Sequence, residues 1–177
     1  FISESGRRDG YTTENSNQRV QWRPGRGETV KGWYPGSMIN KDDRIPLARL
    51  QKSLSESRLT FVSTSGVQPS GSLPFDTVHP VGDYTFRRVP SDSKPADLEI
   101  HQLKYPTVGA KRDLNVIFPI ERLQELVGEG FIRGLTDNFY TFIGYNMDAE
   151  ELERTLAEDI AEAVEAEKPD VVLLAPA

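Results

Sequence analysis

The end of the chain limits the possible folds more than any other part of the sequence. Residues 149 to 167 are rich in glutamate and predict a long amphipathic helix, with Asp148 as its N-cap. The short apolar run Val171–Ala175 follows at once and predicts a strand. A helix that leads directly into an apolar strand is typical of α/β proteins. The residues expected to face inward recur every four positions: Leu152, Leu156, Ile160 and Val164.

The segments from residue 45 onward repeat this alternation of helix, strand and loop. A helix is predicted over about residues 46 to 57, and another runs from Ile120 to Gly128 after Pro119. We expect Leu59–Ser63 and Val171–Leu174 to be buried, parallel strands near the centre of the sheet. The predicted fold class is α/β, with a mostly parallel sheet and flanking helices. Further short strands are expected at Leu98–Leu103, Phe131–Ile132 and Phe139–Ile143, and a short strand or extended turn is expected at Asn115–Phe118.

Composition divides the chain into two parts. Residues 1–44 are rich in glycine and charge and lack apolar periodicity, which predicts an extended N-terminal arm. Trp22 and Trp33 in this arm indicate packing on its own domain or a sister subunit, or a ligand-binding aromatic patch. Residues 45–177 are expected to form the α/β domain. Because domains seldom end inside a central strand, we expect the fold to be truncated at its C-terminal strand and the polypeptide to continue past Ala177.

Charge and cysteine content exclude several classes of partner and site. The 177 residues include 21 Lys and Arg and 27 Asp and Glu, and the net charge of −6 argues against nucleic acid or an anionic membrane as a partner. No apolar run approaches the roughly 20 residues of a membrane span, so we expect a cytoplasmic protein. The chain has no cysteine, and its two histidines, His79 and His101, argue against a metal site made by the protein alone.

Polar residues follow the first predicted strand. A second polar cluster lies in the long loop expected over residues 67 to 98. Open α/β sheets bind ligands at the carboxyl ends of their strands. Thr64, Ser65 and Gly66 come directly after the first strand, where they either hold a carboxylate or phosphate or form an ordinary turn. Asp83 and Arg87 either pair to pin the long loop or present Arg87 to a carboxylate substrate.

A third cluster surrounds the strand-borne histidine. His101 can carry a proton near neutral pH, and Asp113 would orient its ring if the fold brought the two together, with Asn115 nearby. The alternative is a structural histidine in a half-buried strand. The glycine-rich loops that bind dinucleotides or ATP are absent from the sequence, which disfavours those cofactors. The acidic helix over residues 149 to 167 is interpreted as a solvated face without chemistry.

A series of short motifs in one order gives the chain a family resemblance over residues 45 to 177. They are Phe61–Val67, Pro74–Asp76, Gly82–Pro90, Ile100–His101, Asp113–Leu123, Glu129–Gly130, Tyr140–Gly144 and Asp170–Pro176. In this order and spacing they resemble the glycine/sarcosine/betaine reductase selenoprotein B and D-proline reductase family.

The resemblance implies a reductase subunit that cleaves a carbon–nitrogen bond in a small amine or amino acid. It places a nucleophilic cysteine or selenocysteine just beyond Ala177, where helix-terminal amides would keep it anionic. For several members it implies a pyruvoyl group on a partner subunit, whereas this chain is expected to hold no cofactor. It also suggests a homo- or hetero-oligomer and a thiol electron donor.

Roles in the expected site combine the polar clusters with the resemblance. His101 and Asp113 are the expected catalytic residues.

Phe139 stands where the family is expected to have a histidine, so any proton transfer assigned to that histidine must be absent or taken up elsewhere. The alternatives are a non-catalytic binding or assembly module of the same fold, and a hydrolase or lyase that uses His101 with a metal. The expected substrate-binding residues are Thr64, Ser65, Gly66, Arg87, Asn115 and Tyr140.

Overall fold

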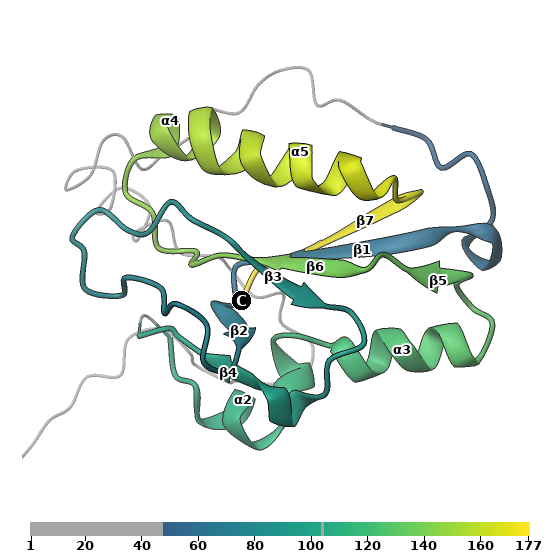
Figure 1. Ribbon diagram of the computed structural model, residues 1–177, viewed down its shortest axis with the longest axis horizontal. Coiled ribbons are helices and arrows are strands. Elements are labelled where there is room, and N and C mark those ends of the chain that lie inside the picture. Colours follow the sequence, from purple (N-terminus) through teal and green to yellow (C-terminus); the bar gives the residue numbers. More distant parts are fainter. Residues whose placement is uncertain (1–47, 104) are drawn as a thin grey trace, which may run out of the picture.

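A sheet with helices on both faces forms the centre of the computed structural model, which describes residues 48–103 and 105–177 (Figure 1). The arm predicted over residues 1–44 lies outside the described residues. The strands are β1 (Arg58–Ser63), β2 (Val67–Pro69), β3 (Arg87–Pro90), β4 (Leu98–Ile100), β5 (Gly134–Leu135), β6 (Asn138–Thr141) and β7 (Val171–Ala175). The α-helices are α2 (Val108–Arg112), α3 (Ile120–Gly128), α4 (Ala149–Glu151) and α5 (Glu158–Glu167), with a π-helical segment at Leu152–Ala157 and 3-10 turns at Leu54–Glu56, Pro95–Asp97 and Leu114–Val116.

β1 is the strand around which the sheet is built. It pairs in parallel with β5, β6 and β7, while β3 adds to β6 in the antiparallel direction. β5 and β6 follow each other along one side of β1, and β7 pairs with β1 over Leu59–Ser63 on the other side. β2 and β4 form a separate antiparallel ladder. The predicted α/β class with a mostly parallel sheet is confirmed.

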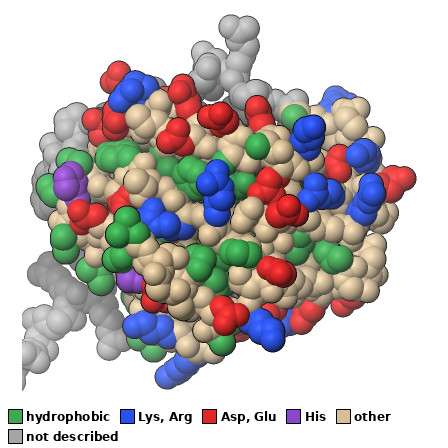
Figure 2. Space-filling model, viewed as in Figure 1, with side chains coloured by type: hydrophobic (Ala, Val, Ile, Leu, Met, Phe, Trp, Pro, Cys, Tyr) green, Lys and Arg blue, Asp and Glu red, His purple; other side chains and the backbone are tan. Residues whose placement is uncertain are grey.

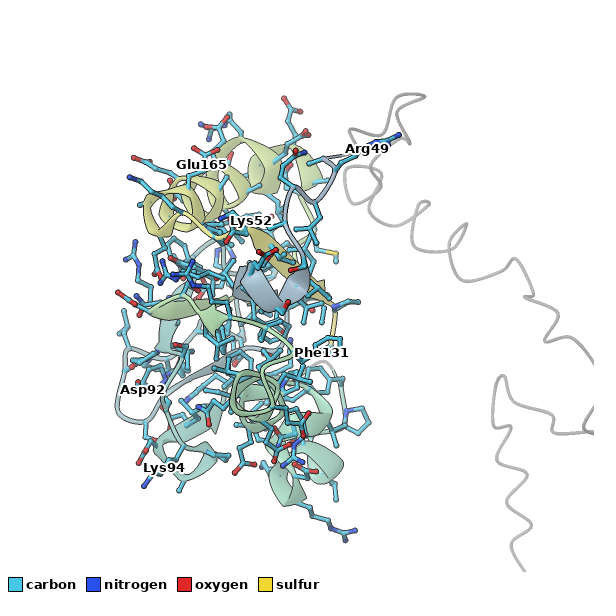
Figure 3. The ribbon with its side chains drawn as sticks, turned by 90° about the vertical axis from the view of Figure 1, so that its right-hand side faces the viewer. Arg49, Lys52, Asp92, Lys94, Phe131 and Glu165 are labelled. Carbon is cyan, nitrogen blue, oxygen red and sulfur yellow. The ribbon has the colours of Figure 1, made fainter. Side chains whose placement is uncertain are left out.

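The two faces of the sheet carry separate cores, because neighbouring residues of a strand point to opposite faces. Phe61 of β1 packs with Phe118 and Phe139 on the α3 side, at ring-centroid distances of 5.3 and 5.8 Å. Val62 faces the other core, with Leu156 from the long C-terminal helix. In Figure 3, Glu165 marks this helical layer on one side of the sheet, and Phe131 lies next to α3 on the other.

The long acidic helix is confirmed. Helical residues run without a break from Ala149 to Glu167, and Asp148 caps the first turn by accepting a hydrogen bond from the amide of Glu151 at 3.0 Å. Three of the four residues expected to face inward, Leu156, Ile160 and Val164, are buried, and Leu152 packs partly against them. Acidic side chains lie along the upper border of Figure 2, over α4 and α5. No described helix is both long enough and apolar enough to cross a membrane.

β7 corrects one prediction. It is parallel to β1, as expected, but Val172 is 42% exposed and Leu174 is 70% exposed. Within the described residues β1 is its only strand neighbour, so β7 lies at an edge of the sheet that these residues form and not at its centre. An apolar run predicts a strand, but the number of its neighbours depends on segments far away in the sequence. The same expectation for β1 is confirmed, since Leu59–Ser63 are buried.

Two local predictions were also wrong, and at a third place the structure decides between two alternatives. The described part of the helix expected over residues 46 to 57 is only a 3-10 turn at Leu54–Glu56, where Ser53 and Glu56 form a capping box and the leucine stays exposed. Of the strand or turn expected at residues 115 to 118, the structure has a 3-10 turn at Leu114–Val116, because the Asp113 side chain accepts the amide hydrogen of Asn115. The strand expected at residues 131 to 132 lies at Gly134–Leu135 instead.

Candidate active site

The loop after β1 turns the chain sharply at the carboxyl end of the sheet. Gly66 has a φ of +65°, and its amide donates to the carbonyl of Phe142 at 3.0 Å. A Cβ atom at this position would lie 2.6 Å from the carbonyl oxygen of His101. Only glycine fits both the backbone conformation and this close approach. The turn therefore brings the end of β1 directly against His101.

Thr64 joins the same loop to the end of β7. Its Oγ1 accepts a hydrogen bond from the amide of Ala177 at 2.9 Å. Gly144, in the loop after β6, leaves room for this side chain, because a Cβ there would lie 2.9 Å from the Cβ of Thr64. The Thr64–Gly66 loop thus meets the chain just after the carboxyl end of β7.

His101 lies beside this loop, and its nearest carboxylate is Glu99. The His101 amide donates to the carbonyl of Gly66 at 2.9 Å. Its Nε2 is 3.1 Å from Oε1 of Glu99, which also accepts a hydrogen bond from Nε2 of Gln68 at 3.1 Å. The sequence pattern favoured Asp113 as the partner of the histidine. In the structure the partner is the carboxylate of Glu99 in β4, two residues before His101.

Asp113 and Asn115 are held by local hydrogen bonds in the turn before α3. Oδ1 of Asp113 accepts hydrogen bonds from the amide and the side chain of Asn115, both at 3.0 Å. The Asn115 side chain also donates to Glu121 at 2.7 Å. Among the described residues, no hydrogen bond or ion pair joins these two side chains to His101. The structure therefore places them as a cap that ties the turn to α3.

Arg87 pins the long loop to the sheet. Its guanidinium donates to the carbonyl of Leu73 at 3.0 Å and lies 4.2 Å from the ring centroid of Phe75. It also donates to the hydroxyl of Thr85 at 2.8 Å, and that hydroxyl in turn donates to Asp83. The structure thus connects Asp83 and Arg87 through Thr85, in place of the direct pair considered from the sequence.

Tyr140 is buried under the C-terminal helix, away from the loop after β1. Its hydroxyl lies 2.8 Å from both the carbonyl of Ala163 and Oε1 of Glu167. Burial, followed by the carboxylate of Glu167, raises the pKa of Tyr140 to about 12. Burial also opposes ionisation of Glu167, but hydrogen bonds from Asn138 and Tyr140 outweigh it and lower the pKa of this carboxyl. These contacts fix α5 on the sheet.

Two features of the loop were not predicted. Ser65 is fully buried, and within the described residues its Oγ has no hydrogen-bond partner. The hydroxyl of Tyr105 donates to the Ser65 carbonyl at 2.9 Å, and burial raises the pKa of Tyr105. The alternation of β4 could have indicated that Glu99 and His101 share a face, but no sequence pattern connects Tyr105 to the loop. No group of three or more potential metal ligands occurs in the described part of the chain.

Comparison with known proteins gives the family. Residues 30–177 match the model of the family described as glycine/sarcosine/betaine reductase selenoprotein B. The chain belongs to this family. It is 28% identical over 123 residues to the D-proline reductase subunit gamma of Acetoanaerobium sticklandii. The aligned region covers 70% of the chain and 50% of that protein. It is 27% identical over 155 residues to the glycine reductase complex component B subunit gamma of Symbiobacterium thermophilum. This aligned region covers 84% of the chain and 34% of that protein.

The chain thus spans half or less of the length of these relatives. No solved structure gave a significant match to it. The family fits a reductase subunit, and the relatives' names describe components of multi-subunit reductases.

Proposed function

We propose that this chain forms the N-terminal part of a reductase subunit that cleaves the carbon–nitrogen bond of a small amine or amino acid. The observation that supports it best is the hydrogen bond between Thr64 and Ala177, in a loop that also contacts His101. Family membership supports a reductase subunit. We propose that the reaction takes place at these contacts, since the carboxyl ends of parallel strands are where α/β sheets bind ligands.

The proposed nucleophile is a thiolate or selenolate shortly beyond Ala177. It attacks the carbon that carries the nitrogen, so a carbon–sulfur or carbon–selenium bond forms as the carbon–nitrogen bond breaks. The departing amine takes one proton. One thiol of a dithiol donor then attacks the sulfur or selenium, so the bond to carbon breaks and the carbon takes a second proton. The second thiol of the donor displaces the thiolate or selenolate from this mixed intermediate, which regenerates the nucleophile and oxidises the donor to a disulfide. The donor thus supplies the two electrons of the reduction.

This chain's own residues would handle the proton and the substrate carboxylate. A histidine can donate a proton to a leaving amine near neutral pH, which assigns that role to His101. At the Thr64–Gly66 loop, the amides of Ser65 and Gly66 already donate to Ser63 and Phe142, so the partly exposed hydroxyl of Thr64 is the group proposed to meet a substrate carboxylate. The Oγ of Ser65 lacks a partner among the described residues, but it is fully buried, so this proposal places no ligand on it. Arg87, Asn115 and Tyr140 already have protein partners, so this proposal uses none of them at the substrate.

The test is chemical labelling of the full-length protein. After reduction, the protein is treated with iodoacetamide and mapped by mass spectrometry, with and without glycine, sarcosine, betaine or D-proline. We expect one labelled residue shortly after Ala177, protected by one of these compounds, which should also be reduced when a dithiol is supplied. Absence of any reactive thiol or selenol in that segment would contradict the proposed chemistry and favour a binding or assembly module.

A further inference from the structure

A line of three polar side chains crosses the β2–β4 ladder beside the proposed site. Gln68 and Glu99 are register partners, and Glu99 and His101 lie two residues apart, so all three point to one face. Oε1 of Glu99 lies 3.1 Å from both Nε2 of Gln68 and Nε2 of His101. One carboxylate oxygen therefore holds the buried amide on one side and the imidazole on the other.

The orientation of Gln68 follows from its two partners. Its side-chain nitrogen lies 3.2 Å from the carbonyl oxygen of Ser72 and 3.1 Å from Oε1 of Glu99. Both partners are acceptors, so only the amide nitrogen can face them. Gln68 is fully buried and cannot turn away without leaving these acceptors unpaired. It therefore fixes where the Glu99 carboxylate stands.

Glu99 stays ionised in this arrangement. The hydrogen bond from His101 is the main cause that lowers the pKa of Glu99, and hydrogen bonds from Gln68 and the backbone of Gly71 add to it. Asp113, the carboxylate suggested by the sequence, is occupied by Asn115. Within the described residues, Glu99 is the only carboxylate that lies within ion-pair distance of His101.

We propose that Glu99 is the positioning residue of His101. It binds Nε2 and so leaves Nδ1 of the same ring for a ligand at the carboxyl end of the sheet. Within residues 48–103 and 105–177, Nδ1 makes no hydrogen bond, and the side chain of His101 is 31% exposed. A carboxylate on one ring nitrogen fixes both the ring orientation and the nitrogen that carries the proton. The inference rests on the proposed function only for proton transfer at Nδ1, which donates when the ring carries both protons and Glu99 holds Nε2–H.

The geometric part is tested by NMR on the full-length protein with ¹⁵N-labelled histidine. A carboxylate partner slows solvent exchange of the imidazole N–H and moves its resonance downfield, so we expect a visible Nε2–H signal, assigned by its loss in H101Q. Exposed His79 serves as an internal control without such a signal. E99A should abolish the signal, and E99Q, which keeps an acceptor oxygen but not the charge, should move it upfield. E162Q makes the same chemical change on the exposed side of α5 and should leave it unchanged.

The functional part is tested by the kinetics of the same variants. We expect kcat to fall about tenfold in E99Q and about 100-fold in E99A, with a much smaller change in KM, because a misplaced proton donor slows the chemical step. A missing wild-type signal, or one unaffected by E99Q, would overturn the geometric inference even if E99A fails to fold. Unchanged kcat in a folded E99Q protein would overturn the positioning role. An inactive wild-type protein would instead overturn the proposed function. The NMR result would still show whether Glu99 binds Nε2 of His101.

Discussion

β1 and β7 are neighbouring parallel strands of similar apolar composition, yet their surroundings differ. β1 has strands on both edges and a core on each face, so Leu59–Ser63 are buried. β7 pairs only with β1 among the described residues, and Leu174 is 70% exposed. Burial in a sheet is thus decided by the neighbours of a strand as much as by its own residues. The chain segments just after the carboxyl ends of the two strands nevertheless meet, because Thr64 is hydrogen-bonded to Ala177.

The largest effect is expected where β1 is most enclosed. Phe61 is fully buried between Phe118 and Phe139. Phe61→Ala should lower the free energy of unfolding by about 3 to 5 kcal/mol, because it removes a large side chain and leaves a cavity. Urea denaturation of wild type and variant would measure this. A loss below about 1 kcal/mol would show that β1 is not the centre of the core.

The helix that covers β1 should be nearly as sensitive. Leu156 is 1% exposed and packs against Val62 of β1. Leu156→Ala should therefore cost about 2 to 5 kcal/mol of unfolding free energy. Glu153→Ala, on the exposed face of the same helix, is the matched control and should change stability by less than about 0.5 kcal/mol. Equal effects of the two substitutions in thermal melting would contradict the assigned helix orientation.

A smaller, pH-dependent effect is expected at the junction between α5 and β7. The folded protein lowers the pKa of Glu167 below its ordinary value of 4.5 through hydrogen bonds from Asn138 and Tyr140. Its carboxylate therefore adds stability above the ordinary pKa, and this part is lost as the pH falls through the lower, folded-state pKa. Glu167→Gln should remove about 1 kcal/mol at neutral pH and flatten the acid side of the stability profile. If the stability of the variant fell with acid pH in parallel with that of the wild type, the proposed contribution of the Glu167 carboxylate would be contradicted.

The smallest effect is expected on the exposed side of β7. Leu174→Ala in the 177-residue chain should change the free energy of unfolding by no more than about 0.5 kcal/mol, since most of the side chain is already in water. Calorimetry of the Leu174→Ala and Phe61→Ala variants side by side would compare the stability that the two strands contribute. A loss of 2 kcal/mol or more would mean that β7 is buried in solution and that the contrast is false.

Much of the architecture could be predicted from local patterns. The period of four over residues 149 to 167 predicted the C-terminal helix, and the apolar run at residues 59 to 63 predicted a buried parallel strand. The edge position of β7 could not be predicted, because strand order depends on pairings between distant segments. The capping box at Ser53 and Glu56 stabilises only one turn, so it did not extend into the helix expected there.

The site was predictable in part. The loop at Thr64–Gly66 and the position of His101 beside it followed from strand ends and family motifs. Asp113 looked like the partner of His101 because both residue types suit a proton relay, yet its turn binds it to Asn115. Glu99 was overlooked, although alternation along β4 places it on the same face as His101. Sequence showed which residue types were present, and the β2–β4 register decided which of them met.

The most direct test of the proposed site is substitution of His101 in the full-length protein. His101→Ala should abolish reductive turnover of whichever of glycine, sarcosine, betaine or D-proline the wild type reduces. The melting temperature should hardly change, since the imidazole is partly exposed and its ion-pair partner, Glu99, is a partly exposed carboxylate. Unchanged turnover, or a large drop in melting temperature that accounts for the lost activity, would contradict a catalytic site at the carboxyl end of β1.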